Sequence, residues 1–244
     1  VYGAGRLHRG DVDLCNHAAI QGQHLNNTVM YTPIYAGPNL ATLIGFFAIN
    51  VHWIDIGGIT PRSSDIFMEG LQLRSIKLWS KGEPIQEVYR IIENNTRFPV
   101  ELLGDIAAQH AGCVLGRDLT QALADKYGVD VFFGAMKTML DQSEAAARAK
   151  VRAIADGEYS YETFFDNDGE SDDALPIRVK VVVAGDDMTI DYSGIAGQVR
   201  GCINSGYYGG GRTTARVAFK YLVGHDGTAN EGTFRPPKFI VPEG

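Results

Sequence analysis

The sequence predicts an α+β protein, β-rich in its N-terminal part, helical in its centre, and with a β-hairpin and a helix at its C-terminal end. Apolar residues alternate with a period of two before about residue 78, recur with a period of 3.6 between 83 and 155, and alternate again from 157. The 244 residues, 45% of them hydrophobic, can bury a core in one large domain or two small ones. We expect three segments: 1–82, β-rich; 83–156, a helical subdomain; and 157–244, with a β-hairpin, a glycine-rich loop and a helix.

The first segment is predicted to contain an antiparallel hairpin. Side chains alternate in residues 29–35, and residues 40–56 are rich in β-branched and aromatic residues. Between them lies the turn sequence Gly37-Pro38-Asn39. Residues 31–35 should therefore pair with residues 43–47.

The second segment is predicted to form helices packed as antiparallel hairpins. Pro84 and Pro99 suit the first turns of two of them, because proline is tolerated at that position. Asp118 is placed to cap a third helix, which Gly128 ends. We expect a fourth and longest helix over residues 130–155.

Two further patterns support the helical and hairpin assignments. Glu144 and Arg148 have the spacing of a helical ion pair. In the third segment, residues 177–181 and 188–192 alternate on either side of a turn at Gly185, which predicts a second hairpin.

Two loops of the third segment resemble ligand-binding motifs without matching them. The acidic stretch 166–173 lacks the ligand spacing of a calcium loop, so we interpret it as a solvated loop. The glycine-rich stretch 206–211 precedes a helix predicted over 213–223, but it fits neither a Walker loop nor a dinucleotide fingerprint. It stays a candidate for a loop near an active site.

Charge and cysteine content exclude several classes of protein. A net charge of −7 disfavours nucleic acid or an anionic membrane as the main partner. No apolar run is long enough to span a membrane, and we expect no signal peptide. The three cysteines have no metal-binding or redox spacing, so we interpret them as reduced, buried thiols of a cytoplasmic protein.

His52 and Asp55 are the strongest candidates for chemistry from the residues alone. They interrupt an apolar strand just before Gly57-Gly58, where the chain can bend and bring both side chains together. Buried imidazole and carboxylate groups need partners. A divalent metal such as Zn²⁺, Mn²⁺ or Fe²⁺, or a hydrogen bond between the two side chains, would satisfy them equally well.

Several strings along nearly the whole chain resemble one family. In order, they are Gly10-Asp11-Val12, the block 52–61 (HWIDIGGITP), Glu69-Gly70-Leu71-Gln72-Leu73, Asn95-Thr96-Arg97, Asp191-Tyr192-Ser193-Gly194 and Asn230-Glu231-Gly232. The chain resembles the B component of the hydantoinase/oxoprolinase family, which includes B-type subunits of N-methylhydantoinase and of acetone and acetophenone carboxylases. Because those subunits are longer, the chain is similar to the central part of a larger polypeptide.

The resemblance implies a two-subunit enzyme. An A-type, ATP-binding partner would activate the substrate by phosphorylation, and the B-type subunit would complete the reaction with a divalent metal. His52 and Asp55 occupy the family's His-x-x-Asp metal positions, and His24 matches a further family histidine. This chain departs from the family at His17, Asn27 and Trp53, so His17 or His24 is expected to serve as an additional ligand or a general base.

Three functions follow as hypotheses. The first is ATP-dependent hydrolysis of a cyclic amide such as a hydantoin or 5-oxoproline. The second is carboxylation of a small ketone with the same partner and metal. In the third, the chain is a non-catalytic scaffold for the A-type subunit.

Overall fold

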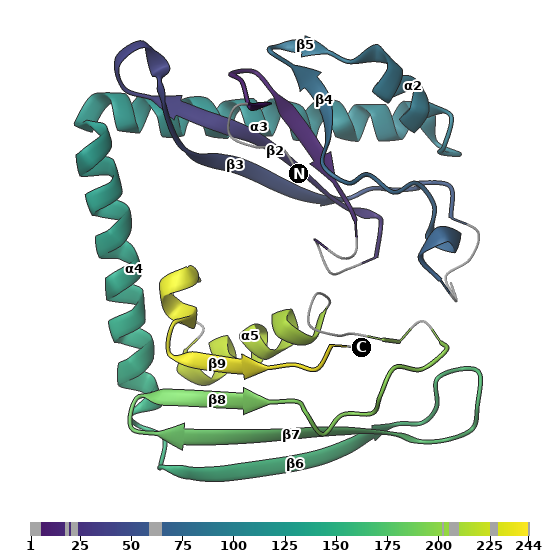
Figure 1. Cartoon of the computed structure of the whole chain (residues 1–244), viewed down its shortest axis with the longest axis vertical. Helices are drawn as coiled ribbons and strands as arrows, with labels where there is room; N and C mark the ends of the chain where they lie inside the picture. The colour runs from purple at the N-terminus through teal and green to yellow at the C-terminus, as the bar shows by residue number, and fades with distance from the viewer. Residues whose placement is uncertain are drawn as a thin grey trace. The chain divides into compact units, whose positions relative to one another are not determined.

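The computed structural model describes residues 6–17, 20, 24–58, 65–201, 203–204, 210–224 and 229–243 (Figure 1). The chain divides into two compact units, Val1–Phe133 and Gly134–Gly244. Strands and helices occur in both units, which confirms the α+β class. Cys202 and most of the glycine-rich stretch 206–211 lie outside the described residues.

A five-stranded antiparallel sheet forms the first unit, with strand order β3-β2-β1-β4-β5. The strands are β1 (Val12–Cys15), β2 (Asn27–Ala36), β3 (Thr42–His52), β4 (Ile76–Ser80) and β5 (Glu83–Pro84). The predicted hairpin is confirmed: β2 pairs with β3, with Tyr31 opposite Ala48 and Tyr35 opposite Leu43. A 3-10 turn at Pro38–Leu40 connects these two strands.

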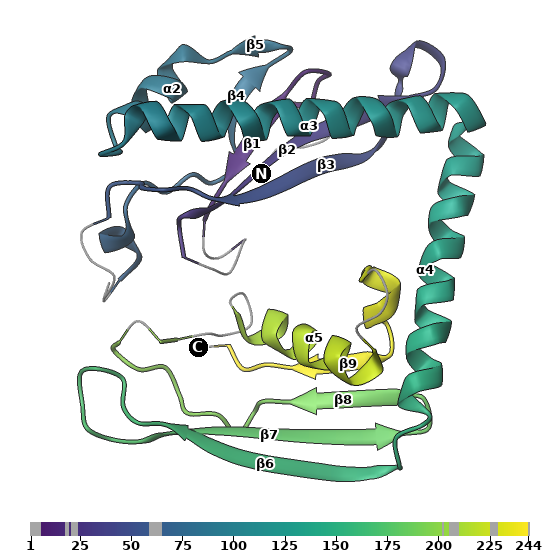
Figure 2. The ribbon, with the colours of Figure 1, turned by 180° about the vertical axis from the view of Figure 1, so that it is seen from behind.

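One face of this sheet is covered by helix α3 (Pro99–Tyr127), which runs along it in both views (Figures 1 and 2). Leu14 and Met30 of the sheet share a buried core with Leu102 and Ile106 of the helix. Helix α2 (Gln86–Glu93) contributes Ile92 to the same core. This apolar burial is the main source of stability for the first unit.

Two glycines let α3 approach the sheet closely. A methyl group at Gly116 would clash with the ring of Phe47, and one at Gly112 would lie 2.6 Å from Cδ1 of Ile49. Because α3 uses Gly116 for packing, the helix passes through this position without a break.

The helix boundaries correct two predictions. The second and third helices are one helix, α3, and Asp118 does not cap a new helix but accepts a hydrogen bond from Nε of Arg117 at 2.7 Å inside it. Pro84 does not begin a helix either; it lies in β5 opposite Trp79, and α2 starts two residues later. An edge strand tolerates proline because the missing N–H is not needed for pairing.

The second unit combines a four-stranded sheet with two helices. Its strand order is β6-β7-β8-β9, with β6 (Gly157–Phe165), β7 (Leu175–Ala184), β8 (Asp187–Asp191) and β9 (Pro237–Ile240). The predicted hairpin is confirmed by the β7–β8 pairing, whereas β8 and β9 run parallel. Helix α4 (Val129–Val151) begins in the first unit and continues into the second, and α5 (Gly210–Val223) confirms the helix predicted over 213–223.

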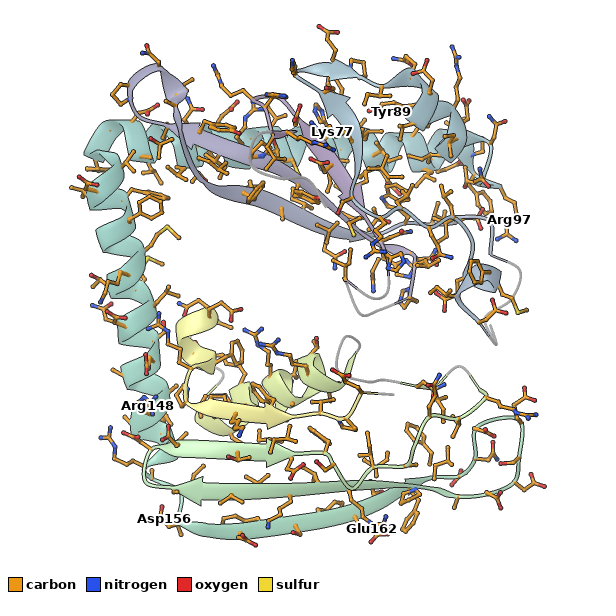
Figure 3. All side chains as sticks on the ribbon, in the orientation of Figure 1. Lys77, Tyr89, Arg97, Arg148, Asp156 and Glu162 are labelled. Carbon is orange, nitrogen blue, oxygen red and sulfur yellow. The ribbon has the colours of Figure 1, made fainter. Side chains whose placement is uncertain are left out.

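The second unit also fixes its turn through charge. Arg148 forms the predicted ion pair with Glu144 at 2.9 Å and also pairs with Asp186 and Asp187 in the β7–β8 turn (Figure 3). The acidic stretch 166–173 is a largely exposed loop, as expected, in which Asp168 accepts the backbone N–H groups of Glu170 and Ser171. Among the helices described, none has the length and apolar character needed to cross a membrane.

Candidate functional site

The candidate site lies on the face of the first sheet opposite α3. Gln109 of α3 donates to the backbone oxygens of Thr28 and Ile49, which places the helix against β2 and β3. On β3, Ile49 and Val51 pack toward this core, whereas Asn50 and His52 are exposed. Because side chains alternate along a strand, His52 projects from the face opposite the helix.

His24 and His52 meet at the end of this face. Their ring centroids are 4.9 Å apart, with an interplanar angle of 65°, so the contact is edge to face. Asn27, directly opposite His52 on β2, places its Nδ2 atom 3.5 Å from Nε2 of His24. Both histidines are exposed, so a small molecule can reach their ring nitrogens.

The backbone around this histidine pair is held by buried polar contacts. Trp53, fully buried, donates its indole N–H to Oε1 of Gln109 at 3.1 Å and its backbone N–H to the backbone oxygen of Asn26 at 2.8 Å. On the other side, the backbone N–H of Leu25 donates to Oε2 of Glu69 at 3.0 Å. These contacts fix the residues next to His24 and His52, and therefore the spacing between the two rings.

His17 lies close to the same segment. The side chain of the preceding residue, Asn16, donates to the backbone oxygens of Leu25 and Leu71 and accepts from the N–H of Leu73. The Nδ1 atom of His17 is buried and has no hydrogen-bond partner among the described residues. Among the described contacts, none joins His17 to His24 or His52.

Asp55 is held by Arg97 rather than by His52. Its Oδ1 accepts from Nε of Arg97 at 3.0 Å and also from Nη2, and its Oδ2 accepts from the backbone N–H of Arg97 at 2.6 Å and the hydroxyl of Thr96 at 3.2 Å. Arg97 is labelled in Figure 3. Its hydrogen bonds hold the pKa of Asp55 down, at about 2, despite burial, which acts in the opposite direction.

Arg97 also fixes the bend predicted at Gly57-Gly58. Nη2 of Arg97 donates to the backbone oxygen of Gly58 at 2.9 Å, and Gly57, with φ +86°, pairs with Gly70 in an isolated bridge. The bend therefore directs the Asp55 carboxylate toward Arg97. The residues alone did not predict this partner; the string Asn95-Thr96-Arg97, shared with the family, is the signal that could have found it.

The histidines and Asp55 meet the needs of a divalent metal only in part. Two adjacent imidazoles are suitable nitrogen ligands. The Asp55 oxygens already accept hydrogen bonds from Arg97 and Thr96. In the described ranges, no group of three or more His, Cys, Asp or Glu side chains is arranged to hold a metal ion. These residues therefore do not complete a metal site by themselves.

Comparison with known proteins defines the class of protein. The family model for hydantoinase B/oxoprolinase matches residues 1–244, and the chain belongs to this family. A relative from Pseudomonas sp. (strain NS671), the B-type subunit of a putative D-/L-hydantoinase, is 30% identical over 257 residues, covering 98% of this chain and 42% of its own length.

Two solved structures share the fold. The ATP-dependent caprolactamase from Pseudomonas jessenii superposes with a TM-score of 0.89 and 26% identity, over 97% of this chain and 41% of the caprolactamase chain. Acetone carboxylase in a nucleotide-free state superposes with a TM-score of 0.84 over 95% of this chain and 32% of its own; at 16% identity, this likeness shows the fold alone. The chain thus spans about two fifths of the length of the hydantoinase and caprolactamase chains.

Proposed function

We propose that this chain is part of a B-type subunit of an ATP-dependent enzyme that hydrolyses a cyclic amide. The observation that carries the proposal is the exposed pair His24 and His52, in a chain whose fold matches a caprolactamase described as ATP-dependent. The word "subunit" in the name of the hydantoinase relative supports a partner chain. We propose that the partner is an A-type, ATP-binding subunit.

The two proposed subunits would divide the chemistry. Transfer of a phosphoryl group to the amide oxygen on the A-type subunit would convert that oxygen into a good leaving group. Water must then attack the activated carbon and lose a proton, which requires a general base at neutral pH. An imidazole is the side chain best suited to that proton transfer.

We assign the role of general base to His24. In the tautomer favoured by its contact with the Asn27 amide, Nε2 is the unprotonated ring nitrogen and so the atom that accepts the proton. The edge of the His52 ring limits rotation of the His24 ring. The neighbouring residue Leu25, held by Glu69, fixes the backbone from which His24 projects. We propose His17, with its unpartnered Nδ1, as a second residue that contacts the substrate.

A divalent metal remains part of the proposal, with His52 as one ligand. When bound, such an ion would polarise the activated group and lower the pKa of a water molecule. Since Arg97 engages Asp55, ligands other than the Asp55 carboxylate would have to complete the site. The role of His24 is independent of this ion.

Carboxylation of a small ketone is the second candidate, favoured by the shared fold with acetone carboxylase. There the activated enol would attack CO₂ instead of water attacking an amide. The two reactions differ in their need for bicarbonate, which gives a direct way to separate them.

The test is turnover by the chain reconstituted with its A-type partner. We expect His24→Ala to lower turnover of a cyclic amide by about 10²- to 10⁴-fold, the usual contribution of a general base. His8→Ala, a change at an exposed histidine away from the pair, is the matched control and should leave turnover unchanged. Turnover that requires bicarbonate would favour the carboxylase. Full activity of His24→Ala and His52→Ala would contradict a catalytic role and favour the scaffold.

A further inference from the structure

A second cavity in the first unit carries a concentrated positive charge. It has a volume of about 370 Å³ and lies where the turn before β1, the β4–β5 turn and α3 come together. Three cations line it, Arg9, Lys81 and Arg117, and its other side chains include Tyr35 and Gln121. Its lining contains no acidic residue among those described. In a chain of net charge −7, such a cavity has the opposite sign to the molecule as a whole.

The cations are largely free to bind an anion. Arg9 and Lys81 form no ion pair with any residue that the structure describes. Arg117 uses its Nε atom to contact Asp118, so its two terminal nitrogens remain available. An arginine fork with free nitrogens matches the oxygens of a phosphate or a carboxylate.

The backbone that presents two of these cations is fixed by a buried carboxylate. Asp11 is fully buried, and it accepts the backbone N–H of Lys81 at 2.8 Å and that of His8 at 2.8 Å. Lys77 adds an ion pair to the same carboxylate at 2.6 Å (Figure 3). Asp11 therefore ties the turn that carries Arg9 to the turn that carries Lys81.

Close backbone contact makes the same junction rigid. The N–H of Gly82 donates to the oxygen of Gly10 at 3.0 Å, and a Cβ atom at Gly10 would lie 2.6 Å from that nitrogen. Gly10 has φ +78°, which favours glycine at this position. Because the junction is held before any ligand arrives, binding would require little ordering of these two turns.

We propose that this cavity binds the phosphate group of a small molecule. Three positive charges around one hollow suit a doubly charged anion better than a single carboxylate. The cavity exceeds the size of a phosphate ion, and the buried Pro33 and the ring of Tyr35 provide an apolar wall for an organic carrier. The hydroxyl of Tyr35 donates to the backbone oxygen of Leu7 at 2.9 Å, which fixes the position of that ring. The proposal does not depend on the histidine pair or on amide hydrolysis.

The test measures binding to the complete chain by isothermal titration calorimetry at low salt. Inorganic phosphate, ADP, adenosine and succinate are the four probes, so that free phosphate, a phosphate ester, the carrier alone and a dicarboxylate are compared. Lys81→Gln and Arg117→Gln remove one charge each from the cavity. Arg90→Gln, which removes an exposed charge on α2 in the same unit, is the matched control.

We expect saturable binding of phosphate or ADP, weakened about tenfold or more by each cavity substitution and unchanged by the control. Tighter binding of ADP than of phosphate would identify a phosphate ester as the ligand, and equal binding would identify the free ion. The proposal is overturned if neither binds, if succinate binds as tightly as both, or if Arg90→Gln weakens binding as much as Lys81→Gln. Circular dichroism of each variant shows that the chain remains folded.

Discussion

The carboxylate of Asp55 accepts the guanidinium of Arg97, a residue that lies 42 positions further along the chain. The contact joins the bend after β3 to the segment before α3, next to the end of the sheet where His24 and His52 meet. It leaves Asp55 ionised over the whole physiological range of pH, because its pKa lies at about 2.

This contact predicts acid sensitivity of the first unit. Since the pKa of Asp55 is about 2 in the folded chain and about 4 in the unfolded chain, the unfolded state takes up the proton first as the pH falls. The stability that Asp55 contributes is therefore present above pH 4 and is lost between about pH 4 and pH 2. Urea unfolding followed by circular dichroism across this range should show a smaller decline for Asp55→Asn than for the unsubstituted chain. Identical declines would contradict the assignment.

Metal content should separate the two proposed ligands. We expect zinc, manganese or iron that copurifies with the chain to be retained by Asp55→Asn and lost in His52→Ala, because Arg97 already engages the Asp55 carboxylate. Elemental analysis by inductively coupled plasma mass spectrometry measures this directly. Loss of the metal from a folded Asp55→Asn variant would show that Asp55 is a ligand after all.

Asp13 predicts a pH dependence of the opposite sign. It is fully buried on β1, and neither of its carboxylate oxygens has a hydrogen-bond partner among the described residues. Burial raises its pKa to about 6, the nearby Asp11 adds to this rise, and Lys77 opposes it. The folded state therefore binds a proton more tightly than the unfolded state, so stability falls as the pH rises from about 4 to about 6.

Replacing this carboxyl group by an amide should remove the penalty. At pH 8 we expect Asp13→Asn to raise the free energy of unfolding by up to about 3 kcal/mol, the equivalent of a shift of two pKa units. At pH 4 the gain should be absent. Urea unfolding at both values measures it, with the exposed Asp105→Asn on α3 as the control. An equal effect at the two pH values would mean that ionisation of Asp13 is not the cause.

Gly116 predicts a packing defect. A methyl group there would overlap the ring of Phe47, so Gly116→Ala should lower the free energy of unfolding by about 1–3 kcal/mol as α3 is pushed away from β3. Gly134→Ala on α4 is the matched control, because nothing described lies within 4 Å of its added methyl group. In that variant, higher helix propensity should raise stability by up to about 1 kcal/mol. Equal effects of the two substitutions in thermal unfolding would contradict the close approach at Gly116.

Gln109 predicts a larger loss, because it joins three buried groups. Its amide accepts the indole N–H of Trp53 and donates to the backbone oxygens of Thr28 and Ile49. Gln109→Leu would leave these groups without partners, at a cost of about 2–4 kcal/mol. Urea unfolding measures the loss, and the exposed Gln142→Leu should change stability by less than about 0.5 kcal/mol.

Local patterns were sufficient to predict the hairpins. The alternation in residues 31–35 and 43–47, with the turn between them, corresponds directly to β2 and β3. The same holds for β7 and β8 around Gly185. In both cases the pairing strands are close in sequence, so that turn chemistry and alternation specify the register.

Helix boundaries and site contacts depended on distant residues. Gly116 and Asp118 suggested a break in the helix, but the sheet needs Gly116 for close packing, and Arg117 satisfies Asp118 locally. Likewise, alternation placed His52 on a strand face, while the partner of Asp55 depends on where α3 begins. Tertiary contacts of this kind are absent from any short window of sequence.

The ten-pair register of β2 and β3 has a consequence for how the family can vary in length at this site. His52 reaches the exposed face because an even number of residues separates it from Asn50 and Ala48. A single inserted residue between 46 and 52 would turn His52 toward α3 and separate it from His24. An insertion at 37–41, in the turn, would leave that parity intact. Insertions and deletions should therefore be tolerated at one end of this hairpin and excluded at the other.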